Sequence, residues 1–90
     1  MSTTNTSHTY NIILVDDDRF LLDMYTKKFI DEGYVVESCM AVHDAIGVLE
    51  GGFNADAVVF DLVMPQEDGF DLMRIIREKG LGKNAALIAL

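Results

Sequence analysis

The sequence predicts an α/β fold in which a single parallel β-sheet is covered by helices. Two observations carry this prediction. Apolar runs of strand length alternate with segments of helical periodicity along the 90 residues, and the connections between them are short. Alternation of this kind leads to right-handed crossovers and to parallel strands with helices on both faces of the sheet. The predicted order is βαβαβαβ.

The composition is that of one small folded domain. Half of the residues are hydrophobic and the formal net charge is −8. This charge disfavours binding to nucleic acid or to an anionic membrane surface. Cys39 is the only cysteine, so an internal disulfide is excluded and a reducing compartment, the cytoplasm, is expected. We expect residues 1–9 to form a disordered polar tail and residues 10–90 to form the domain.

The first strand is predicted over residues 10–15, because Ile12 to Val15 form a continuous apolar run typical of a central parallel strand. Asp16, Asp17 and Asp18 follow, and the last of them suits the N-cap of a helix over residues 19–32. The helix has one apolar stripe at helical spacing, formed by Leu21, Leu22, Tyr25 and Phe29.

The second strand is predicted over residues 34–38 and lies nearer an edge of the sheet, because it includes Glu37. The second helix is predicted over residues 42–50. Gly47 inside it costs roughly 1 kcal/mol relative to alanine, which makes it the weakest of the helices.

The third strand, over residues 56–62, places Asp61 after an apolar run that ends before Pro65. Proline cannot donate a hydrogen bond to a strand ladder, so a loop follows over residues 63–68. A third helix is predicted over residues 69–79 and a fourth strand over residues 85–90.

Three carboxylates are predicted to meet at one edge of the sheet. In the flavodoxin-like strand order, strands one and three are neighbours, and ligands bind at their carboxyl ends. Asp16, Asp17 and Asp61 then share one crevice. Taken alone, the run Asp16 to Asp18 is more typical of helix capping. Three carboxylates in one crevice repel each other unless a cation offsets the charge, and oxygen ligands suit Mg²⁺, with Mn²⁺ also acceptable.

A carboxylate beside Mg²⁺ can act as a ligand only, or it can attack phosphorus and form an aspartyl phosphate. Phosphatases of the dehalogenase-like class also use an aspartate at a strand end, but they need a second aspartate two residues later. Val63 occupies that position here, so this class is excluded. A stand-alone hydrolase is disfavoured as well, because no Ser–His or Cys–His pair has suitable spacing.

Two motifs resemble the receiver domain of two-component response regulators. Ile13-Leu14-Val15-Asp16-Asp17-Asp18 is similar to the first strand and acidic pair of that family, and the segment from Asp61 to Gly69 is similar to its phospho-acceptor strand, Met-Pro loop and Asp-Gly. The resemblance implies that Asp61 accepts a phosphoryl group, and that Mg²⁺ is bound by Asp17, Asp61 and the backbone carbonyl of Val63. It implies a looser contact with Asp16, often through water.

The resemblance also implies a partner, a histidine kinase or a histidine phosphotransfer protein, and no enzymatic activity beyond phosphotransfer to Asp61. A complete receiver has a fourth and a fifth helix, a fifth strand, and a Ser or Thr and a Lys beside the phosphoryl group. The sequence to Leu90 lacks these elements. We therefore expect an N-terminal piece of the domain, either a natural or an artificial one.

Without a fifth helix, part of one sheet face is expected to be bare. A large exposed apolar patch indicates association, so a homodimer through this face is expected. A second hypothesis for function follows: the chain is an interaction or dimerisation module whose acidic site is vestigial or binds only Mg²⁺.

Overall fold

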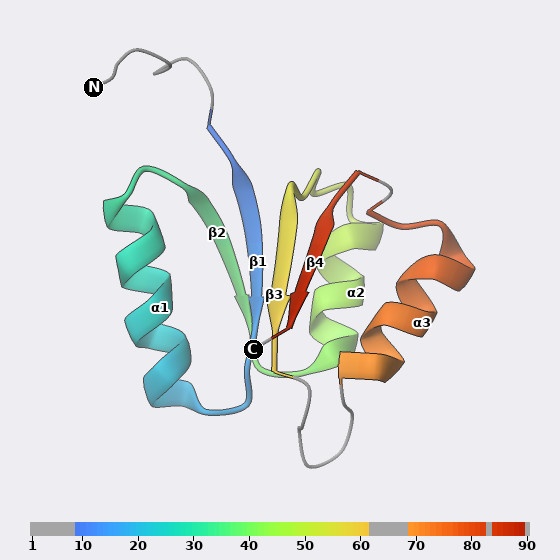
Figure 1. Cartoon of the computed structure of the whole chain (residues 1–90), viewed down its shortest axis with the longest axis horizontal. Helices are drawn as coiled ribbons and strands as arrows, with labels where there is room; N and C mark the ends of the chain where they lie inside the picture. The colour runs from blue at the N-terminus through green and yellow to red at the C-terminus, as the bar shows by residue number, and fades with distance from the viewer. Residues whose placement is uncertain (1–8, 62–68, 83, 90) are drawn as a thin grey trace.

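The computed structural model describes residues 9–61, 69–82 and 84–89. The strands are β1 (Asn11–Val15), β2 (Val35–Cys39), β3 (Ala57–Phe60) and β4 (Ala86–Ala89), and the helices are α1 (Arg19–Asp31), α2 (Val42–Glu50) and α3 (Gly69–Lys79). Strands and helices alternate along the chain as predicted (Figure 1). The expected tail and the loop over residues 63–68 fall largely outside the described residues.

All strand pairs are parallel, and the order across the sheet is β2-β1-β3-β4. This is the order predicted for a flavodoxin-like sheet, with strands one and three adjacent and β2 at an edge. In the register, Val15 lies opposite Phe60, so β1 and β3 end at the same level. The residues that follow these two strands are therefore brought to one edge of the sheet.

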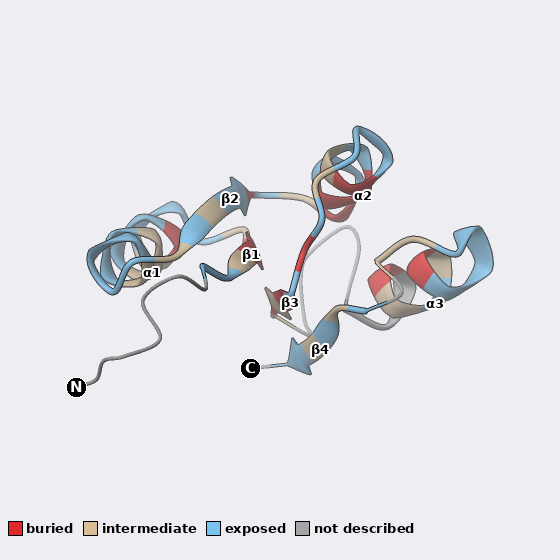
Figure 2. Cartoon of the chain, turned by 90° about the horizontal axis from the view of Figure 1, so that it is seen from above, coloured by how far each residue is buried: buried red, intermediate tan, exposed pale blue. Residues whose placement is uncertain are grey.

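The helices lie on both faces of the sheet but cover them unequally. In Figure 2, α1 stands alone on one side, next to β1 and β2, while α2 and α3 stand on the other. The larger core lies under α2 and α3 and includes Ile13, Val58 and Phe60 from the strands. The smaller core under α1 has four buried members, Ile12, Leu14, Leu22 and Ala57.

Residue alternation along the strands explains why both faces are apolar. Ile13 and Val15 of β1 point to the larger core, whereas Ile12 and Leu14 point to the smaller one. A period of two in a continuous apolar run places side chains on both faces. The central strands therefore need helices packed on each face of the sheet.

The first helix begins and ends where its sequence indicates. Asp18 is the N-cap, and its carboxylate accepts a hydrogen bond from the Leu21 amide at 3.2 Å. After the helix, Gly33 has a φ of +99°, which only glycine adopts readily. The chain thereby turns back towards β2, and the Tyr34 amide donates to the Phe29 carbonyl at 3.1 Å.

Within the described residues, no helix is long and apolar enough to cross a membrane.

Candidate functional site

The candidate site lies at the carboxyl ends of β1 and β3. Asp16 and Asp17 follow β1 directly, and Asp61 follows β3. One carboxylate oxygen from each of the three lies within 4.8 Å of the others. Two segments far apart in the sequence thus bring their acidic side chains together, as the topology predicts. The roles of these residues as ligands or as acceptor remain predictions.

Backbone hydrogen bonds hold the two strand ends in place. The Asp16 amide donates to the Cys39 carbonyl at 3.0 Å, and the Asp61 amide donates to the Val15 carbonyl at 3.2 Å. These bonds continue the β1–β2 and β3–β1 ladders by one residue beyond the strands. The first residue of each acidic segment is therefore fixed by the sheet rather than by a loop.

The three carboxylates differ in exposure. Asp16 is 8% exposed, whereas Asp17 and Asp61 are half-buried. One oxygen of Asp16 accepts a hydrogen bond from the Asp18 amide at 2.9 Å, which stabilises the turn into α1. Asp16 therefore has a structural role in the turn. The looser contact with a cation that is expected of Asp16 stays a prediction.

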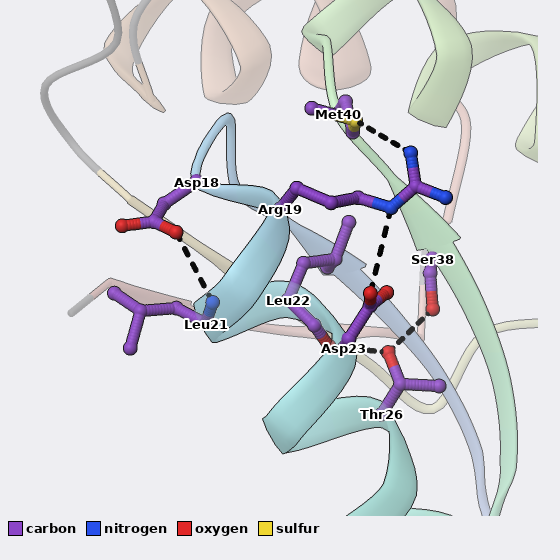
Figure 3. A network of polar contacts seen from close by, with 8 residues as sticks. All are labelled: Asp18, Arg19, Leu21, Leu22, Asp23, Thr26, Ser38 and Met40. Atoms are coloured by element: carbon purple, nitrogen blue, oxygen red, sulfur yellow. Dashed lines mark hydrogen bonds and ion pairs between the residues drawn. The ribbon is translucent and has the colours of Figure 1, made fainter.

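The first half of α1, which follows the acidic pair, contacts β2 and the residue after it, as Figure 3 shows. The Arg19 guanidinium lies 3.5 Å from the Asp23 carboxylate and 3.9 Å from the Met40 sulfur. Further along the helix, the Thr26 hydroxyl lies 2.6 Å from the Leu22 carbonyl and 2.6 Å from the Ser38 hydroxyl. The first turns of α1 are thus tied to the strand next to the site.

Cys39 lies beside the site without belonging to the acidic cluster. Its side chain is buried, and burial raises the pKa of its thiol to about 11, with the charges of Asp44 and Glu37 adding to the shift. Its carbonyl, and not its sulfur, makes the contact with Asp16. No local sequence pattern indicates this contact, because it depends on the β1–β2 register.

The predicted backbone ligand, the carbonyl of Val63, lies outside the described residues. The site can therefore be built from Asp16, Asp17 and Asp61 only. Three closely spaced carboxylates are the donor type that Mg²⁺ and Mn²⁺ prefer. The donor set fits a small divalent cation.

Comparison with known proteins agrees with this fold. The family model of the response regulator receiver domain matches residues 12–90, and the chain belongs to this family. Response regulator MprA of Mycobacterium ulcerans is 35% identical over 71 residues, which are 77% of this chain and 29% of MprA. The chain thus spans about a third or less of the curated relatives it matches.

Two solved structures show the same architecture. A CheY-like receiver domain protein from Methanospirillum hungatei superposes with a TM-score of 0.84 at 28% identity, over 91% of this chain and 64% of that one. The response regulator TrrA of Thermotoga maritima, solved with Mg²⁺ and BeF, gives a TM-score of 0.76 at 28% identity, over 89% of this chain and 67% of that one. The predicted flavodoxin-like receiver fold is confirmed.

Proposed function

We propose that this chain is a phospho-accepting module of a two-component phosphorelay, with Asp61 as the acceptor. The observation that carries the proposal is the meeting of the Asp16, Asp17 and Asp61 oxygens within 4.8 Å, in a chain of the receiver family. Asp61 lies half-buried at the end of the central strand β3, and its backbone is bonded to the sheet. A phosphoryl donor can approach it from the solvent at the carboxyl ends of the strands.

The proposed reaction is transfer of a phosphoryl group from a phosphohistidine. A carboxylate oxygen of Asp61 attacks phosphorus, a P–O bond forms, and the P–N bond to the imidazole breaks. The imidazole nitrogen keeps the electron pair of that bond and takes up a proton. The donor is a histidine kinase or a histidine phosphotransfer protein, and the chain has no catalytic role beyond this transfer to itself.

The acidic cluster fits Mg²⁺, with Mn²⁺ as an alternative. Asp17 and Asp61 are the proposed direct ligands, together with the backbone carbonyl of Val63, and Asp16 contributes more loosely through water. When bound, the cation offsets charge on the transferring group. The protein's own task is to hold Asp61 at the strand end, and the hydrogen bond from the Asp61 amide to the Val15 carbonyl fixes its backbone there.

Phosphorylation by a small donor tests this function directly. The chain is incubated with acetyl phosphate and Mg²⁺ and analysed by intact-mass spectrometry. We expect a species carrying one phosphoryl group, which Asp61→Asn abolishes. Asp23→Asn is the matched control, because Asp23 is an exposed aspartate of α1 whose described partner is Arg19. If the wild type gains no phosphoryl group, or if Asp61→Asn still gains it, Asp61 is not the acceptor.

A second candidate function is that of an interaction module that binds Mg²⁺ without switching. It is favoured by exposed apolar side chains on the face of the sheet that α1 covers in part, Ile88 being 45% exposed. This candidate predicts self-association as a homodimer and stabilisation by Mg²⁺, both in the absence of phosphorylation. Thermal unfolding with and without Mg²⁺ measures the second property, and Asp17→Asn should abolish the Mg²⁺ effect in either case.

The proposed location is the cytoplasm, where the phosphohistidine donors of such relays act. Binding to nucleic acid by this segment is not proposed, because a net charge of −8 repels phosphate.

A further inference from the structure

Two methionines are exposed to solvent in the part of the chain that the structure describes. Met24, in α1, is 47% exposed, and Met40, directly after β2, is 39% exposed. The third described methionine, Met73, is half-buried against the larger core. A thioether that solvent reaches can be oxidised to methionine sulfoxide, which replaces an apolar group by a polar one. Exposure alone therefore predicts that Met24 is oxidised at least as fast as Met40.

The surroundings of the two exposed sulfur atoms differ. Figure 3 shows the Arg19 guanidinium in contact with both Met40 and Asp23. One guanidinium nitrogen lies 3.9 Å from the Met40 sulfur, and another lies 3.5 Å from the Asp23 carboxylate. The ion pair holds the guanidinium beside the end of β2, and its five N–H groups leave donors for a further acceptor. Among the described residues, no guanidinium contacts Met24.

The neighbouring sulfur, that of Cys39, is protected from oxidants. The Cys39 side chain is 4% exposed, and burial raises the pKa of its thiol to about 11, with the charges of Asp44 and Glu37 adding to the shift. At neutral pH the group is a buried thiol, whereas oxidants react with an accessible thiolate. The thioether of Met40 has no proton to lose, so its reaction depends on exposure and surroundings alone.

We propose that Met40 is an oxidation site at which Arg19 assists the reaction and holds the product. The oxidant is a hydroperoxide such as hydrogen peroxide. A sulfur lone pair of Met40 attacks one peroxide oxygen, so that an S–O bond forms and the O–O bond breaks. The second oxygen leaves as hydroxide with the electron pair of that bond, takes the proton of the transferred oxygen and becomes water. The sulfur is oxidised and the peroxide is reduced, each by two electrons.

Arg19 acts both during the reaction and after it. Negative charge develops on the departing oxygen, and a guanidinium N–H beside the sulfur donates a charge-assisted hydrogen bond to it. After the reaction, the sulfoxide oxygen is a stronger acceptor than the thioether and binds the same guanidinium. Arg19 stands two residues after Asp17. Met40 follows Cys39, whose carbonyl accepts the Asp16 amide. The oxidised contact therefore joins the two segments that flank the acidic pair.

The kinetics of oxidation test whether Arg19 assists the reaction. The full chain is treated with dilute hydrogen peroxide at neutral pH, and sulfoxide at each methionine is followed by peptide mapping with mass spectrometry. We expect Met40 to be oxidised roughly fivefold faster than Met24, because the guanidinium offers a charge-assisted hydrogen bond. Arg19→Ala should bring this ratio down to about one or below, as exposure alone predicts. Equal rates in the wild type, or a ratio that Arg19→Ala leaves unchanged, overturn the proposal.

Lys27→Ala is the matched control for Arg19→Ala. Lys27 is also a cation of α1, its side chain is 77% exposed against 73% for Arg19, and it forms an i, i+4 ion pair with Asp31 as Arg19 does with Asp23. The preference for Met40 should persist in Lys27→Ala. Circular dichroism verifies that both variants keep the fold. A preference lost equally in both variants would assign it to the charge of the helix as a whole and contradict a role of the contact.

The held product is tested separately with Met40→Gln, in which an amide oxygen takes the place of the sulfoxide oxygen. Urea unfolding is measured for Met40→Gln, for Arg19→Ala and for the double variant. We expect Met40→Gln to lower the unfolding equilibrium constant by a further factor of roughly three when Arg19 is present, since coupled residues are not additive. Met24→Gln should show no coupling to Arg19→Ala. Additive effects at Met40 would overturn the capture of the product, whatever the outcome of phosphorylation at Asp61.

Discussion

The close approach of three carboxylates, those of Asp16, Asp17 and Asp61, costs electrostatic free energy in the folded protein. At 4.8 Å and an effective dielectric constant of about 20, two unit charges repel by roughly 3 kcal/mol. Asp16 offsets part of this cost by accepting the Asp18 amide hydrogen bond. The remaining repulsion is the free energy that a bound divalent cation can relieve, which is why the cluster suits a cation site.

Cys39 gives a prediction for alkaline pH. The pKa of the thiol is raised from 9.0 to about 11 in the folded protein, so the unfolded chain loses its proton first as the pH rises. The contribution of the thiol to stability is complete below about pH 9 and is lost as the pH approaches 11. Urea unfolding of wild type and Cys39→Ala on both sides of about pH 9 measures this. We expect a steeper alkaline loss of unfolding free energy in the wild type, and equal pH slopes would contradict the assignment.

At the scale of the elements, the sequence predicted the order, the type and the bounds to within two residues. The bounds differ by one or two residues where the ladder decides them. Strand three was predicted from residue 56, but β3 begins at Ala57, although Asp56 still exchanges backbone hydrogen bonds with Asn11 and Ala86. The side-chain bond from Asp56 to the Asn11 amide at 2.8 Å joins residues 45 positions apart, and no local pattern indicates it.

Helix α2 offers a way to stabilise the chain. Gly47 lies on its exposed side, and a Cβ placed there meets no atom within 4 Å. Gly47→Ala should therefore raise the free energy of unfolding by up to about 1 kcal/mol, through helix propensity and a less flexible unfolded chain. Chemical denaturation measures this change.

Gly33→Ala is the matched control for that prediction. It also has open space around it, but its φ is +99°, which is strained for alanine. We expect this variant to be destabilised. If both variants shifted stability in the same direction, backbone conformation would not be what distinguishes the two glycines.

At the scale of the whole molecule, the candidate site could be predicted because it depends on topology alone. Once β1 and β3 are neighbours, Asp16, Asp17 and Asp61 must meet at one edge. How Phe29 and Val59 pack against the smaller core could not be predicted, because it depends on how α1 lies on the sheet. The exposure of Phe20 was not predicted either, since an apolar residue at the start of an amphipathic helix shows no periodic signal.

The strands differ in pairing and in burial, and this difference predicts an unequal distribution of local stability. β1 and β3 pair on both sides and contain fully buried side chains such as Ile13 and Val58. Their amides should exchange with solvent only through global unfolding. β4 pairs with β3 alone among the described strands, and most of its residues are exposed, so its amides should exchange faster in dilute solution.

Hydrogen exchange followed by mass spectrometry tests this distribution. We expect the amides of β4 (Ala86–Ala89) to exchange faster than those of β1 (Asn11–Val15), because β1 has a strand partner on each side and β4 has one partner among the described strands. Equal protection of β4 and β1 would contradict the predicted distribution of stability.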